Sequence, residues 1–420
     1  MTKPNIRPTG EGPGPRALRS VESVSPARDP LDWLRATEAF PKVLFYDLAD
    51  GSFLAGAGAA DLLRVEDPTE ARAIEALLHE RRQGADPTLP GWVGGVRFAP
   101  HRQASREWAP FGAAWWMLPR DYLRSDGKTS FEGRIVGARE EIAAPSVPSD
   151  SAPGEAVGDY HGRVASAVES IRGGEFEKVV LARTVKRAGR PDVAATLGKL
   201  IELETTGYAF WLALSPEYGF FGVTPETLYR RDGVRLRADA LAGTMRRGVG
   251  EDEDRALGEA LVADPKSRNE HAFVKNAIVQ ALDPLASRVV APGNPELRTL
   301  ARVHHLFTPV EAQLLRPEPV LDRLHPTPAV CGTPTRAAEE AIARLEAVDR
   351  GLYSGAVGWW RADGESVGVA LRCAQYARRS TTTFLGAGIV EDSRPESEAR
   401  ELDEKARALF ECWTDQGGPA

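Results

Sequence analysis

The sequence has few of the features that mark secreted, membrane-spanning or metal-stapled proteins. Its 420 residues include only three cysteines, Cys331, Cys373 and Cys412, which lack the paired short spacings of a zinc site and are too few for a disulfide framework. No apolar run approaches the about eighteen residues of a membrane span, and the amino-terminal residues lack the apolar core of a secretion signal. We therefore expect reduced thiols, a buried Cys412 and a cytoplasmic location.

An excess of positive charge is also missing. The 53 Lys and Arg residues are outnumbered by 60 Asp and Glu residues, and no dense basic run is interleaved with aromatic residues. This pattern excludes a nucleic-acid-binding surface. With 42% hydrophobic and 27% charged residues, the composition is that of a globular protein, long enough for one large domain or two to three average ones.

Residues 1–28 are rich in Pro, Gly, Ser and Arg and contain few large apolar side chains, so we expect a disordered tail. A hairpin is predicted around the Asp50-Gly51 turn, with strands on either side of it. A stretch rich in Pro, Ser and Ala at 143–153 reads as a linker or a long surface connection. No chemical motif is evident before it.

An unusual lysine follows that stretch. The segment KVVLAR at 178–183 predicts a strand in which Lys178 shares a face with Val180 and Ala182. Such a lysine either extends to water from the strand end or is desolvated enough to act as a base.

Near the C-terminus, the apolar run LGAGIV at 385–390 is followed by a polar turn and then by Pro395, which predicts a strand, a close-approach loop and the start of a helix over 396–413. Glu398, Glu401 and Lys405 would share one face of that helix. The face can hold a hard cation, and the glycines can admit an anion. The alternative is a solvated acidic face with an ordinary Glu401–Lys405 pair.

Three other residues stand out. Arg372 ends a nearly continuous apolar strand and has no acid beside it in sequence, so a ligand carboxylate is a candidate partner. Asp264-Pro265 predicts the start of a helix that runs to about Leu282 and carries Glu270 in its second turn, where a surface acid is the alternative. His304 is interpreted as a core or loop histidine, because adjacent histidines of a strand face opposite sides.

Singly these motifs are weak, but their order along the chain is specific. The segments are KVVLAR at 178–183, TPE at 224–226, ALAGT at 240–244, NEH at 269–271, HL at 305–306, LHPTPAV at 324–330, YSG at 353–355, LR at 371–372 and the glycine-carboxylate segment at 385–405. In this order they resemble the chorismate-utilising enzymes, and among these the chain is most similar to isochorismate synthases. The resemblance is specific over about 159–409 and looser before that.

The resemblance implies an α+β fold with two β-sheets packed face to face and helices on the outside, the chorismate-binding enzyme fold. It also implies one catalytic domain at 29–417, with an N-terminal part at 29–150 and a motif-bearing part at 155–417, rather than two independent domains.

The resemblance further implies a site for a substrate with two carboxylates. Glu270, Glu398 and Glu401 would hold Mg²⁺ against the ring carboxylate, which Gly243 and Thr244 would contact. Arg372, Tyr353 and the backbone from Gly386 to Gly388, with Lys405 nearby, would bind the enolpyruvyl carboxylate, and His325 would position the substrate. Lys178 matches the family's base and Glu226 its acid for water addition at C2 with loss of the C4 hydroxyl. Lys178 would then need a lowered pKa and Glu226 a raised one.

Three positions bear on the branch of the family. Aminodeoxychorismate synthases place a lysine where Ala242 stands, and anthranilate synthases place a proline at the position of Ala240 and lack a lysine at that of Lys178. Water is thus the expected nucleophile, with no glutaminase subunit and a monomeric chain, feeding menaquinone or siderophore biosynthesis. The alternatives are a bifunctional salicylate synthase that also eliminates pyruvate, an anthranilate-type synthase, and a non-catalytic chorismate-binding subunit.

Overall fold

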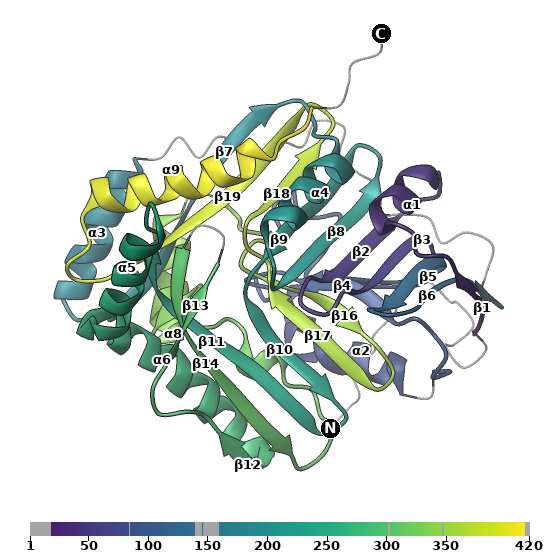
Figure 1. The fold of residues 1–420 in the computed structure, drawn as a ribbon, viewed down its shortest axis with the longest axis horizontal. Coiled ribbons are helices and arrows are strands. Elements are labelled where there is room, and N and C mark those ends of the chain that lie inside the picture. The colour runs from purple at the N-terminus through teal and green to yellow at the C-terminus, as the bar shows by residue number, and fades with distance from the viewer. Residues whose placement is uncertain are drawn as a thin grey trace.

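The computed structural model describes residues 18–83, 85–138, 145, 159–300, 303–346 and 348–415 (Figure 1). No helix in these ranges is both long and apolar enough to cross a membrane.

Strands make up the framework. They are β1 (Arg19–Ser25), β2 (Lys42–Asp47), β3 (Ser52–Val65), β4 (Trp92–Val96), β5 (Ala114–Asp126), β6 (Ser130–Val136), β7 (Lys178–Ala188), β8 (Tyr208–Ser215), β9 (Tyr218–Thr224), β10 (Thr227–Asp232), β11 (Arg235–Arg246), β12 (Ala286–Val290), β13 (Glu296–Thr299), β14 (Val303–Leu314), β15 (Gly332–Thr333), β16 (Ala356–Trp360), β17 (Gly364–Val369), β18 (Cys373–Ala377) and β19 (Ser380–Ile389).

The helices connect and cover these strands. They are α1 (Pro30–Ala36), α2 (Ile74–Arg82), α3 (Tyr160–Arg172), α4 (Val193–Leu203), α5 (Glu251–Ala263), α6 (Pro265–Leu282), α7 (Leu321–Leu324), α8 (Thr335–Leu345) and α9 (Pro395–Glu411), with 3₁₀ turns at Pro68–Ala73 and Asp283–Leu285.

The strands form one antiparallel ladder that divides at β5. One edge of β5 pairs with β3, and the ladder continues through β2, β8, β9, β18, β19, β7 and β15. The other edge pairs with β6 over one half and with β4 over the other, from which a second arm runs through β16, β17, β10, β11 and β14. The two arms are visible as upper and lower groups of strands in Figure 1.

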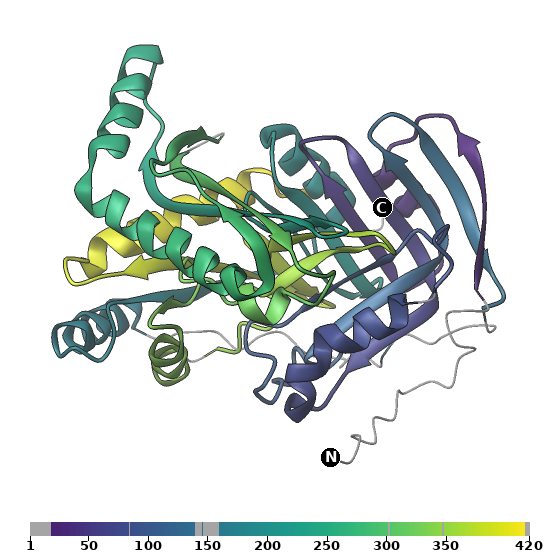
Figure 2. The same cartoon turned by 90° about the horizontal axis from the view of Figure 1, so that it is seen from below.

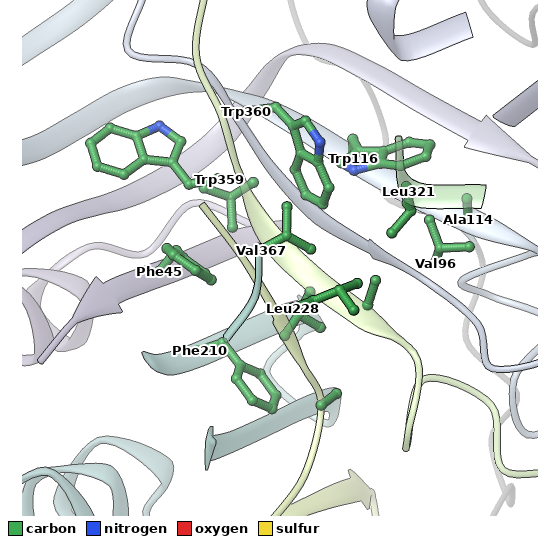
Figure 3. Close-up of a cluster of buried hydrophobic side chains, with 14 of the residues drawn as sticks. Phe45, Val96, Ala114, Trp116, Phe210, Leu228, Leu321, Trp359, Trp360 and Val367 are labelled. Atoms are coloured by element: carbon green, nitrogen blue, oxygen red, sulfur yellow. The ribbon is translucent and has the colours of Figure 1, made fainter. Parts of the chain in front are cut away.

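The main hydrophobic core lies between the two arms. It joins Phe45 and Phe210 of the first arm to Leu228 and Val367 of the second, and these side chains lie near one another in Figure 3. The α+β prediction with two packed sheets is confirmed. The structure adds that the two sheets are continuous through β5.

Helices cover the outer faces. α1 and α4 pack on the first arm through a second core that includes Leu34, Leu197 and Trp211. α3, α8 and α9 pack on β7 and β19 through a third core that includes Val179, Leu181 and Leu402. α6 lies along β11 and β14. Figure 2 shows the same layers turned by 90°.

The predicted disordered tail is wrong in its last part. Residues 1–17 lie outside the described residues, but β1 pairs along its whole length with β6, and Leu18 is buried. The side chains of Val21 and Val24 are exposed, so the composition gave no sign of a strand. Backbone hydrogen bonds to β6 order this segment without a large apolar contribution.

Other local predictions are confirmed. The hairpin around Gly51 is β2 and β3, and α6 begins after an Asp264 side chain that accepts from the Ser267 N–H, 2.8 Å away. Strands of 29–150 pair with strands of the motif-bearing part at β2–β8 and β4–β16. The segment 143–153 lies outside the described residues apart from Pro145. The single-domain boundaries stay a prediction.

Candidate active site

The strand pair β7–β19 carries the candidate base and the glycines on one face. Val179 and Leu181 point into the third core, so Lys178 and the residues alternating with it point the other way. On β19, Gly388 lies opposite Val180 and Gly386 opposite Ala182, which puts both glycines on the face of Lys178. A methyl group on Gly388 would lie 3.1 Å from the Lys178 Cε and 3.7 Å from the Glu270 Oε1. The glycine therefore leaves room for both side chains.

Lys178 is buried and forms an ion pair with Glu270. Its Nζ lies 2.6 Å from the Glu270 Oε1, and the lysine side chain is only 7% exposed. Burial alone would raise the pKa of Glu270, but the charge and hydrogen bond of Lys178, with the more distant Lys266 and Lys405, hold that pKa below its usual value. Glu270 is thus an acceptor for the candidate base. The family resemblance assigns this same Glu270 to the metal, so Lys178 contacts a proposed metal ligand.

Glu226 sits between β9 and β10 and is buried. Its N–H donates to the Thr224 Oγ1 at 3.2 Å, and its carbonyl oxygen accepts from the Val369 N–H at 3.1 Å. Burial raises the pKa of Glu226 to about 7, against the lowering effect of the Lys178 charge and with a raising effect of Asp239. The two groups interact electrostatically, and Glu226 can carry a proton near neutral pH.

Gly243 and Thr244 lie at a bulge in β11. The register with β14 shifts between Ala242 and Thr244, and Gly243 has a φ of 78°, which favours glycine. The Thr244 Oγ1 lies 3.0 Å from the His305 Nδ1. Burial and the nearby charges of Arg372 and Lys405 lower the pKa of His305 to about 4, so its ring is neutral.

Tyr353, Gly386 and Lys405 form a second group. The Tyr353 ring stacks on Phe384 with centroids 5.4 Å apart, and a side chain on Gly386 would overlap the Tyr353 hydroxyl. The Lys405 Nζ donates to the Gly386 carbonyl oxygen at 2.8 Å and pairs with the Glu401 Oε1 at 2.6 Å. The predicted i,i+4 pair on α9 is therefore present and tied to the glycine strand.

The structure pairs Arg372 with an acid that is distant in sequence. Its guanidinium pairs with Glu204, which follows α4 and lies 168 residues away in sequence. A contact of this kind cannot be read from neighbouring residues, so the lack of an adjacent acid did not imply a ligand partner. Arg372 also has a φ of 43°, a left-handed backbone conformation that non-glycine residues seldom adopt.

The three candidate metal ligands are not drawn together. Glu270 is held by Lys178 and Glu401 by Lys405, and in the described ranges no three His, Cys, Asp or Glu side chains gather as metal ligands would. Burial and the nearby Glu401 raise the pKa of Glu398, although Ser393 opposes this with a hydrogen bond. Of the three, Glu398 and Glu401 are near enough for the charge of Glu401 to act on Glu398, and carboxylate oxygens are the ligands that a hard dication prefers.

The histidines differ in role. The His325 Nε2 lies 2.9 Å from the Ser354 carbonyl oxygen, which makes Nε2 the donor of the ring, and burial lowers the pKa of His325 to about 4. His304 is buried and lies 2.9 Å from the Asp254 Oδ1, as the core interpretation predicts. His305 and Glu204 are the residues that sequence reasoning did not assign. His305 lies in a recognised motif segment, whereas Glu204 carries no local signal.

A comparison with protein families identifies the family of this chain. The model described as "Chorismate binding enzyme" matches residues 137–413, two thirds of the chain. The chain therefore belongs to the family of chorismate-binding enzymes, which confirms the resemblance read from the motif order.

The relatives are similar over most of their length. The chain is 32% identical to the salicylate biosynthesis isochorismate synthase of Pseudomonas aeruginosa, over 93% of this chain and 89% of that protein. It is 33% identical to isochorismate synthase EntC of Escherichia coli, over 76% and 80%. Among solved structures, the menaquinone-specific isochorismate synthase MenF of Escherichia coli superposes with a TM-score of 0.81 at 25% identity, covering 96% of both chains.

The packing of Gly386 against Tyr353 gives a first prediction. Gly386→Ala should lower the free energy of unfolding by about 1–3 kcal/mol, because the new methyl group overlaps the Tyr353 hydroxyl. Tyr353→Phe removes that hydroxyl and leaves ring carbon Cζ 3.6 Å from the methyl position, so the double variant should recover most of the loss.

Urea denaturation of the two single variants and the double variant measures this coupling. Gly388→Ala is the matched control, since its methyl group meets the end of the flexible Lys178 side chain and should cost less. Losses of stability that simply add in the double variant would show that the hydroxyl does not occupy the space above Gly386.

Proposed function

We propose that this chain is an isochorismate synthase, an isomerase that converts chorismate to isochorismate by adding water at C2 with loss of the C4 hydroxyl. The observation that carries the proposal is the buried pair of Lys178 and Glu226, whose charges act on one another while the pKa of Glu226 is about 7. A lysine and a protonatable acid facing one site supply the base and the acid that this reaction needs.

The two proton transfers balance. Lys178, after releasing its own proton to solvent, takes a proton from water as the water oxygen bonds to C2, and the ring double bonds shift. The C4–O bond breaks, and Glu226 gives its proton to the departing hydroxyl, which leaves as water. The base and acid exchange protons with solvent before the next turnover.

Anchors for the two substrate carboxylates support the same reading. Lys405 and the Tyr353 hydroxyl lie beside Gly386 of β19, and together with Arg372, which precedes β18, they suit the enolpyruvyl carboxylate. The Gly243–Thr244 bulge on β11 suits the ring carboxylate. His325, held neutral by burial and fixed by Ser354, positions the ring without transferring a proton.

We also propose that Glu270, Glu398 and Glu401 hold Mg²⁺. The donors are carboxylate oxygens, which a hard dication prefers. In the structure Lys178 pairs with Glu270 and Lys405 with Glu401, so two of the three carboxylates already face a positive charge. When bound, the ion would supply positive charge for the ring carboxylate.

Ala242 favours water over ammonia as the nucleophile. It is buried beside the Gly243 bulge and offers only a methyl group, in the place where amine-adding relatives carry a lysine. We therefore expect no glutaminase partner, a monomer and a cytoplasmic location. The relatives are named for menaquinone, salicylate and 2,3-dihydroxybenzoate routes, so isochorismate would enter one of these.

A product assay tests the activity. Purified protein with chorismate and magnesium should yield isochorismate, and chromatography identifies it. Salicylate with pyruvate, formed without an added lyase, would make the chain a salicylate synthase instead.

Lys178→Ala should lower turnover by about 10²–10⁴-fold while chorismate still raises the melting temperature. Lys186→Ala, at an exposed position of the same strand, should stay near the parent rate.

The raised pKa of Glu226 leads us to expect that activity falls at alkaline pH. Its folded pKa of about 7 lies above the usual value near 4.3, so the proton it must donate is present below pH 7 and lost as the pH rises. Turnover should fall by about tenfold per pH unit above that point. Rates of chorismate consumption from about pH 6 to about pH 9 measure this limb. If Glu226→Gln kept both the limb and the rate, another group would be the acid.

The proposed metal ligands predict a shift in magnesium dependence. Glu401→Gln should raise the magnesium concentration for half-maximal activity by about tenfold or more, because it removes a charged ligand. Glu404→Gln alters an exposed acid of the same helix and should leave the titration unchanged. Identical titrations for the two variants would remove Glu401 from the ligand set.

A further inference from the structure

One edge of β7 is only partly covered by another strand. β15 is two residues long and pairs with Lys178 and Val179. Beyond it, the backbone groups of Val180 and Ala182 on this buried edge need other partners, since unpaired buried backbone groups are costly. The Val180 N–H still finds the Cys331 carbonyl oxygen at 2.8 Å.

A buried ion pair supplies two of the remaining partners, while the Ala182 carbonyl oxygen accepts from the Arg163 Nη1 at 3.3 Å. The Glu346 Oε1 accepts from the Ala182 N–H at 2.6 Å, and the Arg350 Nη2 donates to the Val180 carbonyl oxygen at 2.7 Å. The two side chains also bind each other twice, at 2.5 and 2.8 Å, and are 1% and 2% exposed. They continue the ladder of β7 where β15 ends.

The same arginine reaches two further segments. Its Nη1 donates to the Val330 carbonyl oxygen at 2.9 Å, in the loop that follows His325. Its guanidinium lies over the Phe98 ring, 4.4 Å from the centroid. The backbone carbonyl oxygen of Arg350 accepts from the Tyr353 N–H at 3.0 Å. The Phe98 ring in turn packs edge-on against His325.

From these contacts we infer that Glu346 and Arg350 are positioning residues, which set the strand of Lys178 against the segments of His325 and Tyr353. The inference rests on the proposed function, since it concerns the same site. Neither Glu346 nor Arg350 is among the residues assigned above to contact the substrate.

Stability alone does not explain why a buried position carries two charged side chains. Hydrophobic side chains of similar size often replace a buried ion pair without loss, because two charges must be desolvated. Apolar side chains cannot bond the Ala182 N–H and the carbonyl oxygens of Val180 and Val330 together. The fork of the arginine serves both carbonyls at once, and a lysine ammonium cannot reproduce that geometry.

The test compares buried ion pairs at two places. Arg350→Lys and Glu346→Gln should lower kcat for chorismate consumption by about 100-fold, because small displacements of reacting groups have effects of this size. KM should change by less than about threefold, since the carboxylate anchors remain. Rates are taken well below each variant's melting temperature and divided by the folded fraction.

Glu365→Gln is the matched control. Glu365 is buried between Arg82 and Arg231, near the start of β17. The other end of that strand is Val369, whose N–H bonds the Glu226 carbonyl oxygen. It should lose comparable stability and keep kcat within about twofold. Amide exchange gives a second readout: Glu346→Ala should speed exchange of the Ala182 N–H, and Glu365→Gln should not.

Two outcomes overturn the inference. One is equal loss of kcat in Glu346→Gln and Glu365→Gln at equal stability, which would make the effect general. The other is unchanged kcat in Arg350→Lys. The kcat comparison follows chorismate consumption and not a named product, and amide exchange needs no substrate. A protein that forms salicylate would therefore refute the proposed function while this comparison still stands.

Discussion

The site depends on one partly buried contact, the ion pair between Lys178 and Glu270. A lysine inside a sheet is tolerated only if an opposing charge and enough space are present. Glu270 supplies the charge from α6, and Gly388 supplies the space from β19. The contact joins the two arms of the ladder, because β7 belongs to the first arm and α6 packs on β11 and β14 of the second. Acid–base chemistry and the packing of the two arms are therefore coupled at this point.

Electrostatics then separate the roles of the titratable groups. Lys178 and the more distant lysines keep Glu270 ionised, whereas Glu226 lies in a drier position where burial outweighs the same lysine. His305 and His325 are kept neutral by burial. Two glutamates near one lysine thus have pKa values displaced in opposite directions, which suits the ionised one to a cation and the protonatable one to proton donation.

Local features of the fold were predictable where the signal is local. The Asp264 cap, the helix after Pro395 and the alternation of β7 follow from short-range rules, and the motif order indicated the packed sheets. Arg372 pairs with Glu204 across 168 residues, and Lys178 pairs with Glu270 across 92 residues. A pattern of neighbouring residues cannot predict contacts over such separations. β1 was missed because its order comes from backbone pairing with β6, while its side chains stay exposed.

The candidate site lies where the regular ladder is interrupted. β11 bulges at Gly243, the chain leaves β9 just before Glu226, and β15 ends beside Val180. Each interruption opens space that a continuous ladder would fill, and each leaves polar groups that must be bonded. His305 contacts Thr244, the Thr224 hydroxyl bonds the Glu226 N–H and the Val369 carbonyl oxygen, and Glu346 with Arg350 complete β7. Side chains that satisfy these groups fix the backbone on either side of each opening, next to the candidate residues Lys178, Glu226 and Thr244.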